Sequence, residues 1–385
     1  MKNNEFRTNI LDQDYYHITS KNYIEQLKDK DNIVIWGSSN AGQVIYDFLE
    51  EFQLHHKIVY YVDNSKEKWG TKKNDILVIS PDELISMKDK QINIIIASMY
   101  LSPIKKQLLT LGFNNKAIDT KGLQIAKDYL AFKNETPYMM IYSSLEKYEK
   151  VFNYLSDDRS KEVYLGLLNC KISLDNKYLE GISDPEEDQY FDQGIIYLSK
   201  DEVFCDCGSY NGDTLDKYIS LSQGKYKKYI AIEADKNTFT ELEIKIRQNN
   251  YQNILPINVA CWNEKTILHF QSAQSAGHVT ENGEVSVQAD CLDNILKNEE
   301  VTFIKMDIEG AEENALMGAC KTIQSHKPIL AISIYHNLKD LYKLPLLMKD
   351  LNPEYKLFIR HYTEMFDHET VCYAIPKERC AGDNK

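Results

Sequence analysis

The chain has 385 residues, 43% of them hydrophobic, which is enough for two or three domains that each bury a core. Its 58 aspartates and glutamates outnumber 45 lysines and arginines, and the resulting net charge of −13 argues against non-specific binding to nucleic acid. No apolar run approaches the ~20 residues of a membrane span, and the polar N-terminal stretch lacks the apolar core of a signal peptide. We therefore expect a cytoplasmic protein that binds neither nucleic acid nor membrane.

The first predicted domain, an α/β unit over residues 21–125, follows an N-terminal extension of residues 1–20. A buried strand at Ile33–Ile35 leads into a glycine loop, and a second strand ends in Asp63, as in a dinucleotide-binding fingerprint. Ser39 stands where that fingerprint has its middle glycine, and its side chain would hinder the close approach of a pyrophosphate. Two interpretations stay open for this Rossmann-like domain: a nucleotide or nucleotide-sugar site at the loop, or a role in packing or assembly.

Residues 126–200 are predicted to form a helical connector, because apolar residues recur there at helical spacing. The acidic stretch "GISDPEEDQYFDQG" within it carries turn residues and is predicted to be a loop. Its aromatic residues Tyr190 and Phe191 have two interpretations: a hydrophobic plug under the loop, or part of a lid over the pocket of the next domain. The second interpretation makes Tyr190 a candidate substrate-binding residue.

The second predicted α/β domain covers residues 201–376 and is followed by a C-terminal tail of residues 377–385. Five apolar, β-branched segments alternate with helices there, as expected for the central strands of a mostly parallel sheet. These segments are "EVFCDCG", "YKKYIAIEAD", "NILPINVACW", "VTFIKMDIEG" and "PILAISIYH". "YKLFIRHY" and "TVCYAIP" follow without a helix-length spacer, so we expect them to pair as an antiparallel hairpin at the edge of a seven-strand sheet.

This order of elements resembles the class I methyltransferases that use S-adenosylmethionine, and the resemblance explains why acids flank a glycine turn. S-adenosylmethionine has no phosphates to neutralise, and its sulfonium and ammonium groups tolerate carboxylates nearby. Gly208 and Gly212 would allow its close approach, and Asp206 would face its methionine part. Asp213 suits the positive N-terminal end of the helix that follows, and Glu233, at the end of the second strand, would accept hydrogen bonds from both ribose hydroxyls.

Four segments resemble the FkbM family of methyltransferases: "ADCLDNIL", "FIKMDIEGAEENALMGA", "PILAISIYHNLKDLYKLPLLM" and "YKLFIRHYTEMFDHETVCYAIP". The resemblance extends from Leu155 to Pro376, with several motifs agreeing in order and spacing. It implies O-methylation of a sugar or secondary-metabolite hydroxyl, with S-adenosylmethionine as the cofactor. It also implies cofactor-binding roles for six residues, which are Asp206, Gly208, Gly212, Glu233 and, near the adenine, Asn258 and Ala260.

The same resemblance assigns Asp307, Glu309 and Glu312 to the family's acidic motif and His336 to its fifth-strand histidine. Asp307 and His336 both follow strands, so they should reach the same crevice at the carboxyl edge of the sheet. The ordinary pKa of an imidazole makes His336 the first choice for a general base, with Asp307 orienting it, holding the acceptor hydroxyl or binding a divalent cation. Asp307, Glu309 and His336 together would suit magnesium or manganese. The alternatives are that Glu309 caps a helix and that Glu312 is a first-turn charge.

Arg360 and His361 are neighbours in the first strand of the terminal hairpin. They would either bind an anionic acceptor such as a nucleotide-linked sugar, because arginine forks onto phosphate, or be surface residues at a strand edge. The sequence thus predicts an S-adenosylmethionine-dependent O-methyltransferase for a hydroxyl of a sugar, nucleotide sugar or related polyol, with a homodimer left open. Its alternatives are a non-catalytic binding or scaffold protein that retains the fold, and a nicotinamide-dependent oxidoreductase that uses the first domain.

Overall fold

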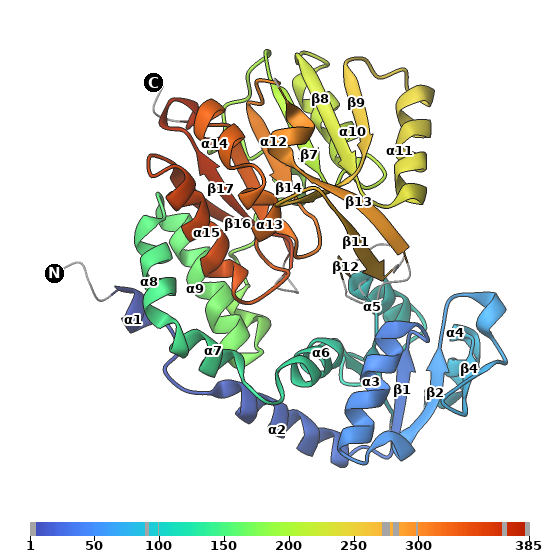
Figure 1. The fold of residues 1–385 in the computed structure, drawn as a ribbon. Coiled ribbons are helices and arrows are strands. Elements are labelled where there is room, and N and C mark those ends of the chain that lie inside the picture. Colours follow the sequence, from blue (N-terminus) through green and yellow to red (C-terminus); the bar gives the residue numbers. More distant parts are fainter. Residues whose placement is uncertain are drawn as a thin grey trace. The chain divides into compact units, whose positions relative to one another are not determined.

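The computed structural model describes residues 5–88, 92–98, 100–271, 278–279, 285–297, 299–363 and 368–381 (Figure 1). The chain forms two compact units. The N-terminal unit comprises Leu11–Ser143 with Asn169–Asp175, and the C-terminal unit comprises Met1–Ile10, Ser144–Leu168 and Asn176–Lys385. The stretch predicted to be a helical connector is therefore divided between the two units. None of the helices within the described ranges is both long and apolar enough to cross a membrane.

The N-terminal unit is built on a six-stranded sheet with the order β3-β4-β2-β1-β5-β6, in which only the β3–β4 pair is antiparallel. Its strands are β1 (Asn32–Trp36), β2 (Ile58–Val62), β3 (Lys72–Lys73), β4 (Ile76–Ile79), β5 (Ile92–Ile96) and β6 (Ile118–Asp119). Its α-helices are α2 (Tyr15–Lys28), α3 (Asn40–Glu51), α4 (Pro81–Leu84), α5 (Leu101–Thr110), α6 (Gly122–Phe132) and α7 (Pro137–Ser143), with 3₁₀ turns at His55–Lys57, Lys66–Lys68 and Ile85–Met87.

Helix α3 shows how the sequence pattern produces this packing. Its buried side chains Ile45, Phe48 and Leu49 recur at helical spacing and therefore share one face of the helix. That face belongs to the same hydrophobic cluster as Ile33 and Ile35 of β1. The predicted Rossmann-like α/β arrangement of this unit is confirmed.

The C-terminal unit contains a seven-stranded sheet with the order β16-β17-β15-β14-β7-β8-β9. Its strands are β7 (Val203–Cys207), β8 (Lys228–Glu233), β9 (Ile254–Asn258), β14 (Phe303–Met306), β15 (Ile329–Ser333), β16 (Lys356–His361) and β17 (Thr370–Ile375). The sheet is parallel from β15 to β9, and β17 runs antiparallel to both β15 and β16. The predicted mostly parallel sheet with its antiparallel terminal hairpin is confirmed.

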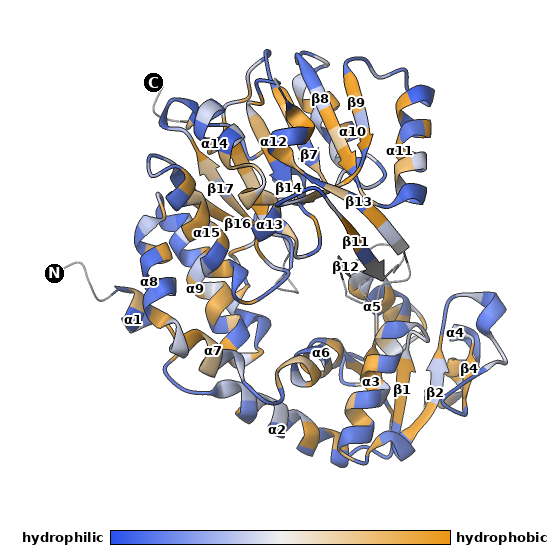
Figure 2. Ribbon diagram, viewed as in Figure 1, coloured by the Kyte–Doolittle hydropathy of each residue, from blue (hydrophilic) through white to orange (hydrophobic). Residues whose placement is uncertain are grey.

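Helices precede these strands in the chain and connect them to one another. They are α1 (Glu5–Asn9), α8 (Leu145–Tyr154), α9 (Asp158–Ser173, in this unit as far as Leu168), α10 (Asp213–Ser222), α11 (Lys236–Gln248), α12 (Leu292–Leu296), α13 (Glu312–Met317), α14 (Cys320–His326) and α15 (Asp340–Leu351), with 3₁₀ turns at Asn176–Tyr178, Glu186–Asp188 and Lys377–Arg379. In Figure 2 the strands are mostly orange, whereas helices such as α11 carry both colours, as expected for helices with one face in the core.

A second, four-stranded sheet corrects the prediction for the segment "NILPINVACW". This segment forms two strands, because after β9 the chain enters β10 (Ala260–Trp262), which pairs with β13 (Val285–Cys291). The sheet has the order β10-β13-β11-β12 and is completed by β11 (Thr266–Gln271) and β12 (His278–Val279). The partner of β10 lies far along the chain, so no local sequence signal separates β10 from β9.

Every residue of β7, β14 and β15 is buried, as expected for central strands that are covered on both faces. Two charged residues interrupt these apolar strands: Asp206 in β7 and Lys305 in β14. They are partners in the register of the two strands. Because a buried charge is costly unless it is paired, the contacts of these two residues lead directly to the candidate site.

Candidate active site

The central strands of the C-terminal unit end side by side. Cys207 is in register with Ile232 and Met306, and Met306 is in register with Ile332. The chain therefore brings the turn after β7, the end of β8, the turn after β14 and the segment after β15 to one carboxyl edge. This is the edge at which open α/β sheets bind their ligands.

Glycine is required at the turn after β7. Gly208 has a φ of +80°, and a Cβ atom there would lie 2.0 Å from the carbonyl oxygen of Asp307. Gly212 has a φ of +84° and directly precedes α10, where a Cβ atom would meet the side chain of Leu242 at 2.9 Å. The turn can pack this closely only without side chains.

Asp206 lies beneath this turn, where its carboxylate contacts other side chains of the sheet. Its side chain is 0% exposed, its Oδ1 atom is 3.0 Å from Nζ of Lys305, and its Oδ2 atom accepts a 2.5 Å hydrogen bond from Tyr229. Lys305 also donates a 2.7 Å hydrogen bond to the carbonyl of Gly208. Burial lowers the pKa of Lys305, but Asp206 and Asp307 outweigh it and raise the pKa above its ordinary value. The contacts favour a supporting role for Asp206, in place of the predicted contact with the methionine part of a cofactor.

Glu233 ends β8 in a fixed orientation. Its Oε2 atom accepts a 2.9 Å hydrogen bond from the amide of Tyr210, and its Oε1 atom accepts a 2.8 Å hydrogen bond from the amide of Asp235. The side-chain amide of Asn258 donates to the carbonyls of Glu233 and Ala234, at 2.8 and 3.1 Å. Asn258 thus holds the end of β8 in place.

The other two predicted cofactor residues differ in exposure. Asp213 is exposed at the first position of α10, and its Oδ1 atom accepts a 2.7 Å hydrogen bond from the amide of Thr214. Ala260 is buried in β10, where it is in register with Ala289 of β13. Asp213 can therefore meet a ligand directly, whereas Ala260 contributes to the packing of the second sheet.

Two tyrosines hold Asp307, the residue that follows β14. Tyr190 donates a 2.8 Å hydrogen bond to its Oδ2 atom, and Tyr335 donates a 3.1 Å hydrogen bond to its Oδ1 atom. Tyr190 is itself fixed, because its amide donates to the hydroxyl of Tyr373. Burial raises the pKa of Asp307, but Lys305, His336 and the two tyrosines outweigh it and lower the pKa below its ordinary value. Asp307 is therefore an ionised, oriented carboxylate at neutral pH.

His336 lies among three carboxylates. Its Nε2 atom is 3.5 Å from Asp307 Oδ1 and 3.5 Å from Glu309 Oε2, and its Nδ1 atom is 3.2 Å from Glu312 Oε1. Burial lowers the pKa of His336, but Glu312, Asp307 and Glu309 raise it to about 9. An imidazole with this pKa is protonated at neutral pH and cannot accept a proton. The raised pKa therefore does not favour His336 as the general base that the sequence predicts.

Two glutamates of the acidic motif differ from the prediction in how far they are buried. Glu309, the predicted metal ligand, stands in a left-handed turn with a φ of +57° and has a side chain that is 39% exposed. Glu312, predicted to be a first-turn charge, is 1% exposed, and its Oε1 atom accepts a 2.8 Å hydrogen bond from the amide of Ile308. One ligand atom from each of Asp307, Glu312 and His336 can be chosen so that all three lie within 4.8 Å of one another.

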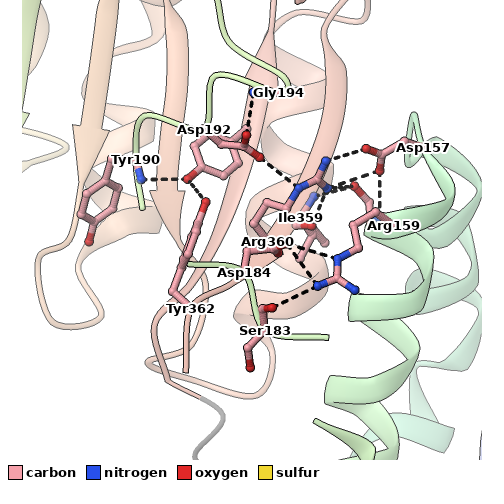
Figure 3. Close-up of polar contacts among 12 residues, drawn as sticks. Asp157, Arg159, Ser183, Asp184, Tyr190, Asp192, Gly194, Ile359, Arg360 and Tyr362 are labelled. Carbon is pink, nitrogen blue, oxygen red and sulfur yellow. Dashed lines mark hydrogen bonds and ion pairs between the residues drawn. The ribbon is translucent and has the colours of Figure 1, made fainter. Parts of the chain in front are cut away.

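Arg360 and His361 lie in β16, the edge strand of the sheet, but both are buried and neither is a surface residue. Arg360 Nη2 lies 2.6 Å from Asp157 Oδ2, and its Nε atom lies 3.2 Å from Asp192 Oδ2 (Figure 3). His361 is 0% exposed, and its Nδ1 atom is 2.9 Å from the hydroxyl of Thr370. The charge of Arg360 is thus satisfied within the unit, which favours a structural role for this pair.

The Arg360 contacts also concern the candidate site, because they anchor the loop that carries Tyr190. Figure 3 shows Arg360 reaching from β16 to Asp157 at the start of α9 and to Asp192 in this loop. The loop is held again where the hydroxyl of Tyr373 accepts a 2.9 Å hydrogen bond from the amide of Tyr190. Tyr190 therefore joins the site through an ordered loop.

In the N-terminal unit, the glycine loop contacts Ala97 and Asp63 of the same unit. A Cβ atom on Gly37 would lie 2.3 Å from the carbonyl oxygen of Ala97, so packing alone requires this glycine. Asp63 Oδ2 accepts hydrogen bonds from the amide and the hydroxyl of Ser38, at 3.0 and 2.6 Å, and lies 3.0 Å from Nζ of Lys68. A carboxylate used in this way is poorly placed to bind a ribose, which favours the packing interpretation of the loop.

Lys305 and Tyr335 were missed by sequence reasoning. A lysine between the apolar residues of "FIKM" was an available signal, because a charge in a buried strand requires a partner. Tyr335 directly precedes the predicted histidine, but nothing in its spacing indicates a contact with Asp307.

The comparisons with known proteins agree with this architecture. Residues 206–362 match the family model described as the methyltransferase FkbM domain, and residues 29–118 match a model described as "C2185-like, N-terminal". No curated protein matches the chain. The crystal structure of methyltransferase FkbM from Methylobacillus flagellatus KT matches 93% of this chain and 98% of its own, with a TM-score of 0.68 and 21% identity.

Two other solved structures are similar over a smaller part of the chain. Precorrin-6y C5,15-methyltransferase from Geobacter metallireducens GS-15 covers 47% of this chain and 84% of its own, at 11% identity and a TM-score of 0.32. Fibrillarin from Aeropyrum pernix, in complex with S-adenosyl-L-methionine, covers 48% of this chain and 71% of its own, at 12% identity and a TM-score of 0.31. The family match and the seven-stranded sheet lead to one conclusion: residues 206–362 are a methyltransferase domain of the FkbM family, built on a class I methyltransferase fold.

Proposed function

We propose that the protein transfers a methyl group from S-adenosylmethionine to a hydroxyl of a sugar, nucleotide sugar or related polyol. The observation that carries this proposal is the shared edge of the sheet. The glycine turn and Glu233 lie at the ends of β7 and β8, and the ionised Asp307 follows the adjacent β14. A cofactor over β7 and β8 would therefore direct its methyl group towards the side of the edge that carries Asp307.

The part of the edge formed by the ends of β7 and β8 suits S-adenosylmethionine. Each carboxylate oxygen of Glu233 accepts one backbone hydrogen bond and keeps a lone pair for a ribose hydroxyl. Gly208 and Gly212 leave the turn without side chains that would block the ligand. The carboxylates at this edge favour a cofactor that carries a positive sulfonium.

The part of the edge that carries Asp307, after β14, suits a hydroxyl acceptor. In the proposed reaction the acceptor oxygen attacks the methyl carbon in line, the carbon–sulfur bond breaks, and its electron pair stays on sulfur. The hydroxyl proton passes to Asp307, whose carboxylate is oriented by Tyr190 and Tyr335. His336, as an imidazolium, would stabilise the orientation of Asp307 and not act as the base.

The charges at the site favour an acceptor that is uncharged near the reacting hydroxyl. Asp307, Glu309 and Glu312 surround His336, and the guanidinium of Arg360 is already paired with Asp157 and Asp192. A phosphate next to the reacting hydroxyl would therefore face carboxylates. A nucleotide sugar fits only if its phosphates lie away from Asp307.

Incubation of the protein with S-adenosylmethionine labelled on the methyl group tests this proposal. The acceptor panel contains neutral sugars, polyols and nucleotide sugars, and the product is located by mass spectrometry. We expect label on an acceptor hydroxyl and release of S-adenosylhomocysteine. If S-adenosylmethionine binds but no member of a broad hydroxyl panel is labelled, the proposed acceptor class is wrong. If nicotinamide cofactors bind in its place, the oxidoreductase alternative is favoured.

A further inference from the structure

Three side chains from two turns of the C-terminal unit meet at one point. Asp307 follows β14, Glu312 begins α13, and His336 follows β15. One ligand atom from each can be chosen so that all three lie within 4.8 Å of one another. Two ligands on opposite sides of a magnesium ion lie about 4.2 Å apart, since each bond is about 2.1 Å. The spacing of the three ligand atoms is therefore close to that required around one ion.

The imidazole supplies a second observation that points to a ligand. The side chain of His336 is 9% exposed, and no described residue gives either of its ring nitrogens a hydrogen bond of good geometry. Both nitrogens nevertheless face carboxylates, at 3.2 Å from Glu312 Oε1 and 3.5 Å from Asp307 Oδ1. The buried Oε2 atom of Glu312 also lacks a hydrogen bond from any described residue. Buried polar atoms that converge without hydrogen bonds call for a partner, and a bound cation would supply one.

We propose that Asp307, Glu312 and His336 bind one divalent cation, such as manganese or magnesium. When His336 releases a ring proton as the cation binds, two carboxylates and one imidazole form a hard-to-borderline ligand set, which suits these ions better than a thiolate site would. The ligand set is fixed on one side, because Oε1 of Glu312 accepts a hydrogen bond from the amide of Ile308. It differs from the sequence-based ligand set, since the buried Glu312 takes the place of the more exposed Glu309.

The catalytic use of this cation rests on the proposed function, although its binding does not. An acceptor oxygen bound to the ion would lose its proton more readily, because the positive charge stabilises the alkoxide. Because Asp307 would then hold the ion, the proton would leave to solvent or to another carboxylate in place of Asp307, and the alkoxide would attack the methyl carbon. The attack still breaks only the carbon–sulfur bond and leaves its electron pair on sulfur.

Manganese binding to the full-length protein tests the site directly. The protein is treated with a chelator and desalted, and manganese is then titrated without S-adenosylmethionine or acceptor while free manganese is followed by electron paramagnetic resonance. We expect one manganese ion per chain, with competition by magnesium. A chain that binds no manganese under these conditions would overturn the proposal, because the convergence of the three side chains would then need no cation.

Matched variants locate the ion. Glu312→Gln keeps an oxygen acceptor for the amide of Ile308 but removes the charge, and we expect it to weaken manganese binding about 10–100-fold. Glu313→Gln is the control, because Glu313 is 50% exposed and pairs with Lys343 at the surface. Glu309→Gln tests the sequence-based ligand set and should weaken binding much less than Glu312→Gln. Circular dichroism verifies that each variant is folded.

Two results distinguish the site from the proposed function. If Glu312→Gln binds manganese as tightly as the unaltered protein, or if Glu309→Gln has the larger effect, the site as assigned is wrong. If manganese binds at this site but no methyl group is ever transferred, the cation site stands and the proposed function fails.

Discussion

The ammonium of Lys305 lies 3.0 Å from the carboxylate of Asp206, and both side chains are buried between neighbouring strands of the sheet. The same ammonium donates a hydrogen bond to the carbonyl of Gly208 in the glycine turn. One buried ion pair therefore supports the turn from below. This relationship links the stability of the sheet to the shape of the proposed cofactor site.

Replacement of Lys305 by methionine should strongly destabilise the C-terminal unit. The variant leaves the carboxylate of Asp206 buried without its partner, which costs about 3–5 kcal/mol when one member of a buried pair is removed. Urea-induced unfolding, followed by circular dichroism, measures the loss. The matched control is Lys343→Met, which removes an exposed pair with Glu313 and should cost less than about 1 kcal/mol. Equal stability of the two variants would show that the Lys305–Asp206 pair does not support the sheet.

Replacement of Asp307 by asparagine should reduce turnover far more than cofactor affinity. Asparagine has nearly the same shape and can still accept a hydrogen bond from Tyr335, but it cannot take up a proton or carry charge. We expect kcat to fall by about 10²–10⁴ with little change in the dissociation constant of S-adenosylmethionine. Single-turnover methyl transfer and calorimetry measure the two quantities. A variant with unaltered kcat would remove Asp307 from the chemical step.

Replacement of Arg360 by methionine separates a structural role from acceptor binding. The variant loses charged hydrogen bonds to Asp157 and Asp192, each worth about 1.5–3 kcal/mol, so the free energy of unfolding should fall. Arg247→Met is the control, because Arg247 is 74% exposed on α11. If stability is unchanged while the KM for the acceptor rises, Arg360 binds the acceptor as the sequence suggested.

Asp63 should make the N-terminal unit sensitive to acid. Burial raises the pKa of Asp63, but Ser38, Ser65 and Lys68 outweigh it and lower the pKa to about 2. An unfolded aspartate has a pKa of about 3.9, so the folded unit gains stability above that pH and loses it as pH falls from about 4 towards 2. Thermal unfolding of the unaltered protein and of Asp63→Asn checks this. The destabilisation caused by Asp63→Asn should be larger at pH 6 than at pH 3, and an equal effect at both would contradict the assigned contacts.

Much of the fold could be predicted because its signals are local. The five apolar segments and the closing hairpin are recognisable from composition and spacing, and the structure confirms their order in one sheet. The pairing of β10 with β13 could not be predicted, because it joins segments that are distant in the sequence. The split after β9 follows from that distant pairing.

The sequence predicts which turns after the strands form the candidate site, but it does not predict the side-chain contacts within it. Asp307 and His336 come together because both follow central strands, which the sequence indicates. Whether Glu309 or Glu312 turns inward depends on the backbone of the turn, where Glu309 takes a left-handed conformation. The ion pair between Asp206 and Lys305 was likewise not predicted, because the register of β7 and β14 is needed to bring the two residues together.

The most direct test of the central claim is calorimetric titration of S-adenosylmethionine into the unaltered protein and into Glu233→Gln. Glu241→Gln, which changes an exposed residue of α11, is the matched control. We predict one S-adenosylmethionine per chain, an affinity lower by about tenfold or more in Glu233→Gln because a charged acceptor is lost, and an unchanged affinity in the control. Absence of binding to the folded, unaltered protein, or equal affinity in all three proteins, would contradict the placement of the cofactor at this edge of the sheet.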